Sequence, residues 1–147
     1  MANALYDLAR QSFLSQSPAL DWDTDTIKVF LIDSATYTPN MATHQYLSDV
    51  PVAARKGNAG GQTRADAPTL GTKTVVAGVA DAADVTIAAI PAGAALEYIL
   101  IFKDDGLADT SSPLIALIDT ATGLPVTPNG GDITIAWDNG ANKIFKL

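Results

Sequence analysis

The sequence predicts a mainly-β protein: an antiparallel β-sandwich or jelly-roll-like fold with one short N-terminal helix. Seven or eight short segments are rich in β-branched and aromatic residues, as strands usually are. Clusters of turn residues separate them, among them Lys103–Gly106 and Asp138–Gly140. A single segment has helical periodicity, so the chain does not alternate strands and helices as an α/β fold does.

The helix is expected near the N-terminus, from Asn3 to about Leu14. Apolar residues recur there with the spacing of one helix face: Leu5, Leu8, Ala9 and Phe13. Asn3 stands before them and is expected to be the N-cap, because its side chain can accept a hydrogen bond from a free amide of the first turn. We therefore expect one amphipathic helix ahead of the strands.

The first strand is expected at Thr26–Asp33, where alternate residues point to opposite faces and both faces are mostly apolar. That pattern suits a strand in the middle of a sheet. A short strand is expected within His44–Val50. The remaining strands are expected at Lys73–Val79, Ala83–Ile90, Leu96–Asp104, Pro113–Asp119, Asp132–Trp137 and Asn142–Leu147.

The last two of these strands are predicted to form a hairpin, because Asn139 and Gly140 are the preferred pair for a type I′ turn. A two-residue turn would place the pairs Trp137–Asn142 and Ile135–Ile144 on one face. Phe145 and Leu147 would then lie on the other face, whereas a three-residue loop would swap the faces. Both faces carry apolar groups, so Phe145 and Leu147 are interface candidates.

Two segments of the chain are nearly the same: LIDSATYTPN at Leu31–Asn40 and LIDTATGLPVTPN at Leu117–Asn129. We interpret each as a buried strand that ends at Asp33 or Asp119, whose carboxylate accepts hydrogen bonds from the amides that follow. Thr-Pro-Asn would then make the next corner in both copies. A catalytic loop and an internal duplication are the alternative interpretations.

A single domain over residues 1–147 is expected from the length. The net charge of −7 repels phosphate backbones, so nucleic acid is not an expected partner. The most apolar window, Val85–Phe102, is broken by Pro91, Gly93 and Glu97, so no membrane span is expected. The first residues do not resemble a signal peptide, which predicts a protein that is not exported. Only 17% of residues are charged, which suggests that part of the surface is covered.

Catalytic chemistry has little support in the sequence. His44 lies near Ser48 and Asp49, but nearness in sequence does not supply the geometry of a catalytic triad. The Gly-rich segment Gly57–Thr63 lacks the Gly-Lys-Ser/Thr of a phosphate-binding loop. Cysteine is absent, which excludes thiolate sites. We therefore expect no enzyme, no catalytic residues and no cofactor.

One acidic segment has the spacing that begins a calcium-binding loop, with Asp21, Asp23 and Asp25 at alternate positions. Thr26 and Ile32 stand where such a loop needs its glycine and its bidentate glutamate. We therefore interpret the segment as a solvated acidic turn with no metal, in which a carboxylate caps nearby amides. Metal binding stays an open alternative.

The segment Val52–Gly71, with a boundary near residue 72, has no periodicity and many small residues. It carries Arg55, Lys56 and Arg64 in an otherwise acidic chain. One interpretation is a flexible, disordered surface loop. The other is an extended arm that becomes ordered against an acidic neighbouring subunit, which makes these three residues interface candidates.

Several segments resemble one family: Ala4–Leu14, Asp21–Asp33, Thr43–Pro51, Ala53–Arg55 and Ile118–Leu147. Together they are similar to small structural virion proteins encoded by tailed bacteriophages. The resemblance covers nearly the whole chain except the Gly/Ala-rich loop, and the C-terminal block is its most specific part. It implies a protein made in the bacterial host cytoplasm and built into the virion, with no catalytic residues to carry over.

Within that family, a capsid decoration or cement protein is the expected role. Its partners would be the major capsid protein and further copies of itself, as trimers or dimers on symmetry axes of the capsid surface. A tail, neck or fibre-adaptor subunit is the alternative. A receptor- or glycan-binding module is a third interpretation, and would use exposed aromatic residues such as Trp22, Tyr37 and Tyr46.

Overall fold

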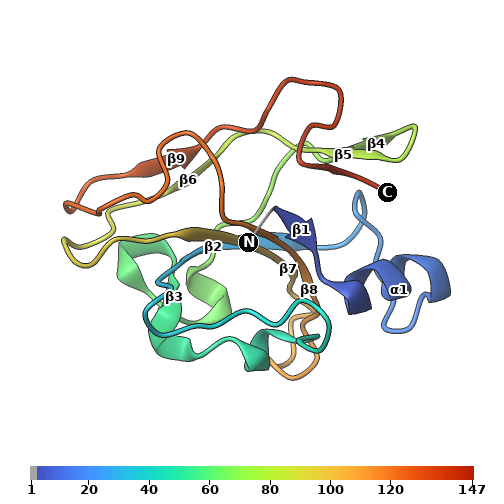
Figure 1. Cartoon of the computed structure of the whole chain (residues 1–147), viewed down its shortest axis with the longest axis horizontal. Helices are drawn as coiled ribbons and strands as arrows, with labels where there is room; N and C mark the ends of the chain where they lie inside the picture. The colour runs from blue at the N-terminus through green and yellow to red at the C-terminus, as the bar shows by residue number, and fades with distance from the viewer. Residues whose placement is uncertain (1–2) are drawn as a thin grey trace.

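The computed structural model describes residues 3–147 and is built of antiparallel sheets with one α-helix, which confirms the predicted mainly-β fold class. One layer is a five-stranded sheet with the order β1-β8-β7-β2-β3. The other layer, drawn above it in Figure 1, consists of a three-stranded sheet, β10-β5-β4, and a two-stranded sheet, β6-β9. The strands are β1 (Ala4–Leu5), β2 (Ile27–Ile32), β3 (Arg55–Lys56), β4 (Thr74–Val76), β5 (Val79–Asp81), β6 (Val85–Ile87), β7 (Tyr98–Lys103), β8 (Leu114–Ile118), β9 (Ile133–Ile135) and β10 (Phe145–Lys146).

The helical segments are α1 (Asp7–Ser15) and four single 3₁₀ turns, η1 (Leu47–Asp49), η2 (Val52–Ala54), η3 (Asn58–Gly60) and η4 (Arg64–Asp66). The four 3₁₀ turns belong to the long connection between β2 and β4, which lies on the side of the five-stranded sheet away from the small sheets (Figure 1). The helix α1 precedes β2 and contacts the upper layer, where Phe13 packs against Phe145. Within residues 3–147, no helix has both the length and the apolar composition needed to cross a membrane.

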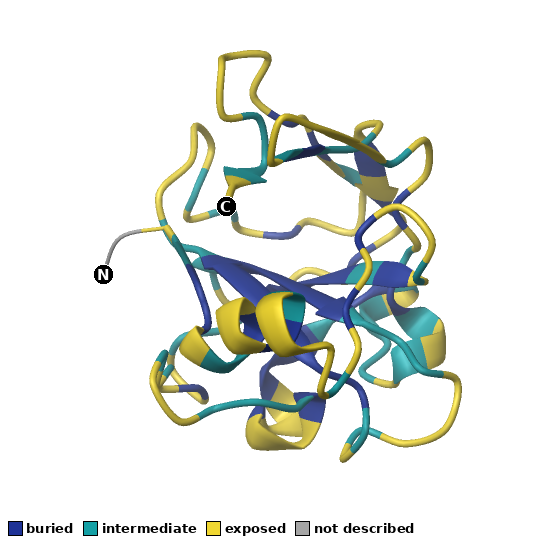
Figure 2. Ribbon diagram, turned by 90° about the vertical axis from the view of Figure 1, so that its right-hand side faces the viewer, coloured by how far each residue is buried: buried dark blue, intermediate teal, exposed yellow. Residues whose placement is uncertain are grey.

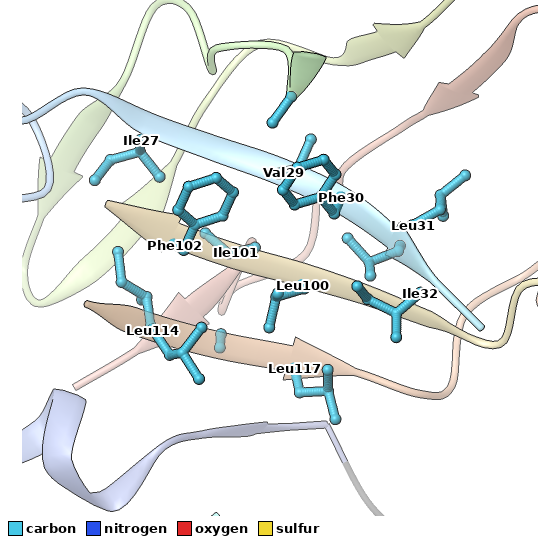
Figure 3. Close-up of a cluster of buried hydrophobic side chains, with 14 of the residues drawn as sticks. Ile27, Val29, Phe30, Leu31, Ile32, Leu100, Ile101, Phe102, Leu114 and Leu117 are labelled. Atoms are coloured by element: carbon cyan, nitrogen blue, oxygen red, sulfur yellow. The ribbon is translucent and has the colours of Figure 1, made fainter. Parts of the chain in front are cut away.

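The centre of the core is the pair β2 and β7, as the apolar pattern of the first strand predicts. Their register places Val29 opposite Ile101 on one face and Phe30 opposite Leu100 on the other. All four side chains are buried, and Phe30 also stacks on Phe102 with 5.4 Å between ring centroids (Figure 3). Because both faces of β2 are covered, successive residues of the strand can be apolar. Buried residues concentrate in this sheet, while much of the upper layer is exposed (Figure 2).

The N-terminal helix begins later than predicted, and the assignment of Asn3 as its N-cap is wrong. Ala4 and Leu5 pair with β8 as an edge strand, so the helix begins at Asp7. Asn3 caps the end of β8 instead: its side-chain oxygen accepts the amides of Asp119 and Thr120, each at 2.9 Å. Pairing with β8 satisfies backbone groups that the first helical turn would leave free, which favours a strand here.

The predicted terminal hairpin is wrong. Neither Asn139 nor Gly140 has the positive φ that a type I′ turn requires. β9 pairs with β6, and the chain then crosses over so that β10 pairs with β5. Phe145 lies opposite Ala80 in that pairing. The local turn preference therefore lost to pairing with strands that are far away in sequence.

Two other predicted strands differ in the structure. Lys73–Val79 is a hairpin, with β4 and β5 joined by Ala77 and Gly78, whose φ angles of 52° and 79° fit a type I′ turn. The segment His44–Val50 is not a strand, since it contains η1 and a single bridge to Pro113. There the Asp49 carboxylate accepts the amides of Gln45 and Tyr46, which stabilises the turn.

The two similar segments follow strands with equivalent positions in the sheet. β2 and β8 both pair antiparallel with β7, one on each side, so both end at the same edge of the sheet. Asp33 makes the predicted turn, since its carboxylate accepts the amide of Ala35 at 2.8 Å. The following corners are also alike: Asn40 accepts the amide of Ala42, and Asn129 accepts that of Gly131. The strand-and-turn interpretation is confirmed at these positions, and an internal duplication stays a hypothesis.

Candidate binding surfaces

Arg55, predicted to be an interface residue on an extended arm, is buried inside the chain. Its side chain is 2% exposed, and its Nη1 donates to Asp109 at 2.6 Å. The remaining donors are also used: Nε donates to the Val50 carbonyl at 3.1 Å, and Nη2 to those of Leu47 and Val50 at 2.8 and 2.6 Å. A guanidinium whose donors face internal carbonyls cannot contact a partner, so this interface assignment is corrected.

Arg64 is likewise held inside the chain. Its guanidinium pairs with Asp104 and with Asp109, the latter at 3.1 Å, and donates to the Leu107 carbonyl at 2.7 Å. Lys28 joins the same cluster through a 2.9 Å ion pair with Asp104. The acidic turn at residues 104–109 therefore neutralises the basic loop from within the chain. Net attraction between these charges explains why the loop folds back on the body.

The segment 52–71 is thus not an extended arm. β3 pairs with β2, the amide of Asp33 donates to the Ala54 carbonyl at 2.9 Å, and short 3₁₀ turns occupy much of the rest. Lys56 is the one basic residue of the three outside the ion-pair cluster; it is half-buried and donates to the Ala53 carbonyl at 3.1 Å. Its role as an interface residue stays a prediction.

His44 belongs to a chain of hydrogen bonds and does not line up with Ser48 and Asp49 as a triad would. The hydroxyl groups of Tyr6 and Tyr37 lie 2.9 Å apart, and the Tyr37 hydroxyl lies 2.9 Å from Nδ1 of His44. Burial raises the pKa of Tyr37 to about 12. Asp49 caps backbone amides instead of orienting the imidazole. The arrangement joins the connection after β2 to the start of α1.

The acidic segment before β2 is tied to the body of the protein. The Asp25 carboxylate accepts the amide of Asp21 at 2.8 Å and pairs with Lys103 at 2.9 Å. A hydrogen bond between the carboxyls of Asp21 and Asp23 raises the pKa of Asp23 and lowers that of Asp21. In the described part of the chain, no three His, Cys, Asp or Glu residues gather where they could hold a metal ion.

The aromatic residues proposed for glycan binding do not form an exposed groove. Trp22 and Tyr37 are each 3% exposed, and Tyr46 is half-buried. Trp22 donates its indole N–H to the Asp81 carbonyl at 3.0 Å and packs edge-on against Phe145, with 5.1 Å between ring centroids. Trp22 therefore links the segment before β2 to the upper layer, and the glycan interpretation of these aromatic residues is corrected.

Exposed apolar residues lie on the three-stranded sheet, on its edge strand β4 and after β10 at the opposite edge. Val75 and Val76 of the edge strand β4 are 49% and 70% exposed, and Leu147 is 57% exposed. A groove of about 390 Å³ separates this sheet from α1, and its apolar lining includes Phe13, Val75, Phe145 and Leu147. Phe145 is half-buried against Trp22, so of the two terminal candidates Leu147 is the more available. We call Val75 and Val76 the β4-edge patch.

A second cleft, which we call the interlayer cleft, lies between the two layers and has a volume of about 660 Å³. Its floor is the upper face of the five-stranded sheet, with Leu31, Ile99 and Ile118, and its opposite wall is the chain from Ile133 to Asp138. Sequence reasoning missed this cleft because its walls come from segments that are far apart along the chain. Only the apolar strand patterns were visible, and they do not show where a sandwich stays open.

No family model matches this chain, and no curated protein matches it either. We therefore base the functional proposal on the surfaces described above and on the resemblance carried by the sequence.

Proposed function

We propose that this chain is a non-enzymatic structural subunit of a tailed-phage particle that docks on the major capsid protein lattice and stabilises it, as a decoration or cement protein does. The observation that carries the proposal is the β4-edge patch, in which Val75 and Val76 are exposed on an unprotected strand edge. Edge strands are usually blunted by charge, proline or a covering element. β4 has neither charge nor proline, which favours a covering partner.

The rest of the molecule supports a role in docking. Every buried side-chain nitrogen and oxygen in residues 3–147 has a hydrogen-bond partner, and the long loop after β2 is fixed by the ion pairs of Arg55 and Arg64. A body that is already ordered loses little conformational entropy on binding. Covering apolar side chains then contributes about 25 cal/mol for each Å² removed from water.

A tail, neck or fibre-adaptor subunit is the alternative station. It would use the same exposed apolar edge, and the number of copies in a particle distinguishes the two stations. Decoration proteins follow the capsid lattice, whereas neck and tail parts form one small ring.

A binding experiment with purified particles made without this protein tests the proposal. Val76→Lys places a charge on the β4 edge, and we expect it to abolish co-sedimentation with the particles while the fold is kept, since Val76 is exposed. Val52→Lys is the matched control, because Val52 is also an exposed valine but lies in η2, away from β4 (Figure 1). Equal co-sedimentation of wild type and Val76→Lys would refute docking through this edge.

A further inference from the structure

β9 forms one wall of the interlayer cleft. β9 pairs with β6 along one side only, with Ile133 opposite Ile87 and Ile135 opposite Val85. Beyond the ladder, the amide of Trp137 donates to the carboxylate of Asp84 at 2.9 Å, which continues the contact on the β6 side. Since successive residues of a strand direct their amides and carbonyls to opposite sides, those of the residues between point away from β6.

Thr134 and Ala136 are these residues, and their backbone faces the cleft. Both line the cleft, although their side chains are exposed on the outer face, where the Thr134 hydroxyl bonds to that of Thr86 at 2.8 Å. Among the described residues, none forms a backbone hydrogen bond with Thr134 or Ala136 on this side. The cleft therefore contains an unpaired strand edge.

The floor opposite this edge is apolar. Leu31, Ile99 and Ile118 project from the five-stranded sheet. Several aliphatic side chains that line the cleft are only partly buried: Ile118, Leu124, Val126, Ile133 and Ile144. Covering half-buried aliphatic side chains that share one cleft with a further apolar group removes apolar surface from water, which favours binding.

One end of the cleft is acidic. Asp138 and Lys143 both line it, but Lys143 is paired with Asp81 at 3.4 Å. Asp138 is exposed and has no ion pair within residues 3–147. The charge left at this end is negative, which complements a basic group on a ligand.

We propose that the cleft binds an extended polypeptide segment of a partner protein, which adds to the free edge of β9 as a further strand. Its backbone would exchange hydrogen bonds with Thr134 and Ala136, which stand about 6.7 Å apart along a strand. Its alternate side chains would be apolar and cover the floor, and a basic residue would lie beside Asp138. An extended backbone is the chemistry that offers donors and acceptors at this spacing, which a small apolar ligand does not.

This inference deepens the proposed function, and it rests on that function only for the source of the segment. The first test uses no phage particle, so the two can fail separately. The probe is a short synthetic peptide in which valine and threonine alternate after one lysine. In nuclear magnetic resonance titrations of the full chain, we expect the amides of Thr134 and Ala136 to shift and their hydrogen exchange to slow at least tenfold.

A control peptide carries N-methyl groups on the amides that would face β9, which removes the donors and leaves the side chains unchanged. We expect its affinity to fall at least tenfold. Asp138→Lys should weaken binding of the lysine peptide about two- to fivefold, the size of an exposed ion pair. A glutamate in place of the peptide lysine should restore that loss, which a merely structural effect of the substitution would not do.

Three outcomes would overturn the inference. The first is no binding at millimolar peptide, and the second is equal protection of Thr134 and Ala136 by the N-methylated peptide. The third is slow exchange of both amides in the free protein that becomes fast on dilution, because the edge would then be occupied by a second copy of this chain.

Discussion

Arg55 shows how much a single residue organises in this protein. Its guanidinium satisfies the carbonyls of Leu47 and Val50 and pairs with Asp109, which joins the connection after β2 to the turn between β7 and β8. Charge in so buried a place is stable only when it is paired and hydrogen-bonded. The residue is therefore a structural link between segments more than fifty positions apart in sequence.

We expect Arg55→Ala to lower the free energy of unfolding by about 3 kcal/mol, because it leaves buried carbonyls without donors and Asp109 with one cation fewer. The neighbouring Lys56→Ala should change it by less than about 0.5 kcal/mol, the usual effect at a surface position. Urea unfolding followed by circular dichroism measures both. If the two variants prove equally stable, the internal role of Arg55 is wrong.

The lowered pKa of Asp105 makes the stability of the fold depend on pH. Burial alone would raise its pKa, but hydrogen bonds from the hydroxyls of Ser111 and Ser112 and the amides of Leu107 and Ala108 lower it from 3.8 to about 2. The folded state favours the charged carboxylate of Asp105 more than the unfolded state does. The resulting stabilisation is therefore complete above about pH 4 and is lost as the pH falls toward 2.

The contribution of this carboxylate amounts to about 2 kcal/mol, from the size of its pKa shift. We therefore expect Asp105→Asn to make the free energy of unfolding fall less steeply between pH 4 and pH 2 than in the wild type. Urea titrations at a series of pH values show this slope. Parallel curves for the two proteins would contradict the assignment.

At the scale of elements, the short strand β10 closes the three-stranded sheet and covers Trp22. Phe145 packs against Trp22 and against Phe13 of α1, with ring centroids 5.1 and 6.1 Å apart. Removing residues 142–147 would therefore uncover the edge of β5 and the contact between the upper layer and the helix, and we expect the truncated protein not to fold.

A milder change tests the same contact. Phe145→Ala should lower the free energy of unfolding by about 2 kcal/mol, which is below the usual cost for a fully buried phenylalanine because this ring is half-buried. Leu147→Ala is the control and should be nearly neutral for stability, since Leu147 is 57% exposed. Thermal unfolding compares them, and equal losses would show that β10 does not anchor the layer.

The elements that sequence predicted well are those whose signal is local. β2 was recognisable because both its faces are apolar, and the turn after it because Asp33 accepts an amide two residues away. The predicted hairpin at Asn139 failed because β10 pairs with β5, some sixty residues earlier. A turn preference worth a fraction of a kcal/mol cannot compete with a strand that buries an aromatic ring.

At the scale of the whole molecule, the surfaces were harder to predict than the fold. The basic loop appears in the sequence as a disordered loop or an arm because the acids that neutralise it, Asp104 and Asp109, lie forty residues or more away from Arg64. The exposure of Val75 and Val76 could not be predicted, since a sequence does not show which strand lies at the edge of a sheet. Leu147 is exposed, but the hairpin that predicts it as an interface residue does not form, and its interface role stays a prediction.

The β4-edge patch and the interlayer cleft each present the unpaired edge of a strand, β4 in the first and β9 in the second. A body with such edges can add strands or apolar surface from its neighbours without rearranging. A structural subunit of a particle needs these properties more than it needs a polar site.

The most direct test of that role is the copy number of this protein in purified phage particles, measured by quantitative mass spectrometry against the major capsid protein. A decoration or cement subunit predicts a ratio near one to one, or a simple fraction set by the capsid lattice. A dozen copies or fewer in each particle would contradict the cement role and assign the chain to the neck, tail or fibre attachment. Absence from the particle would contradict a structural role altogether.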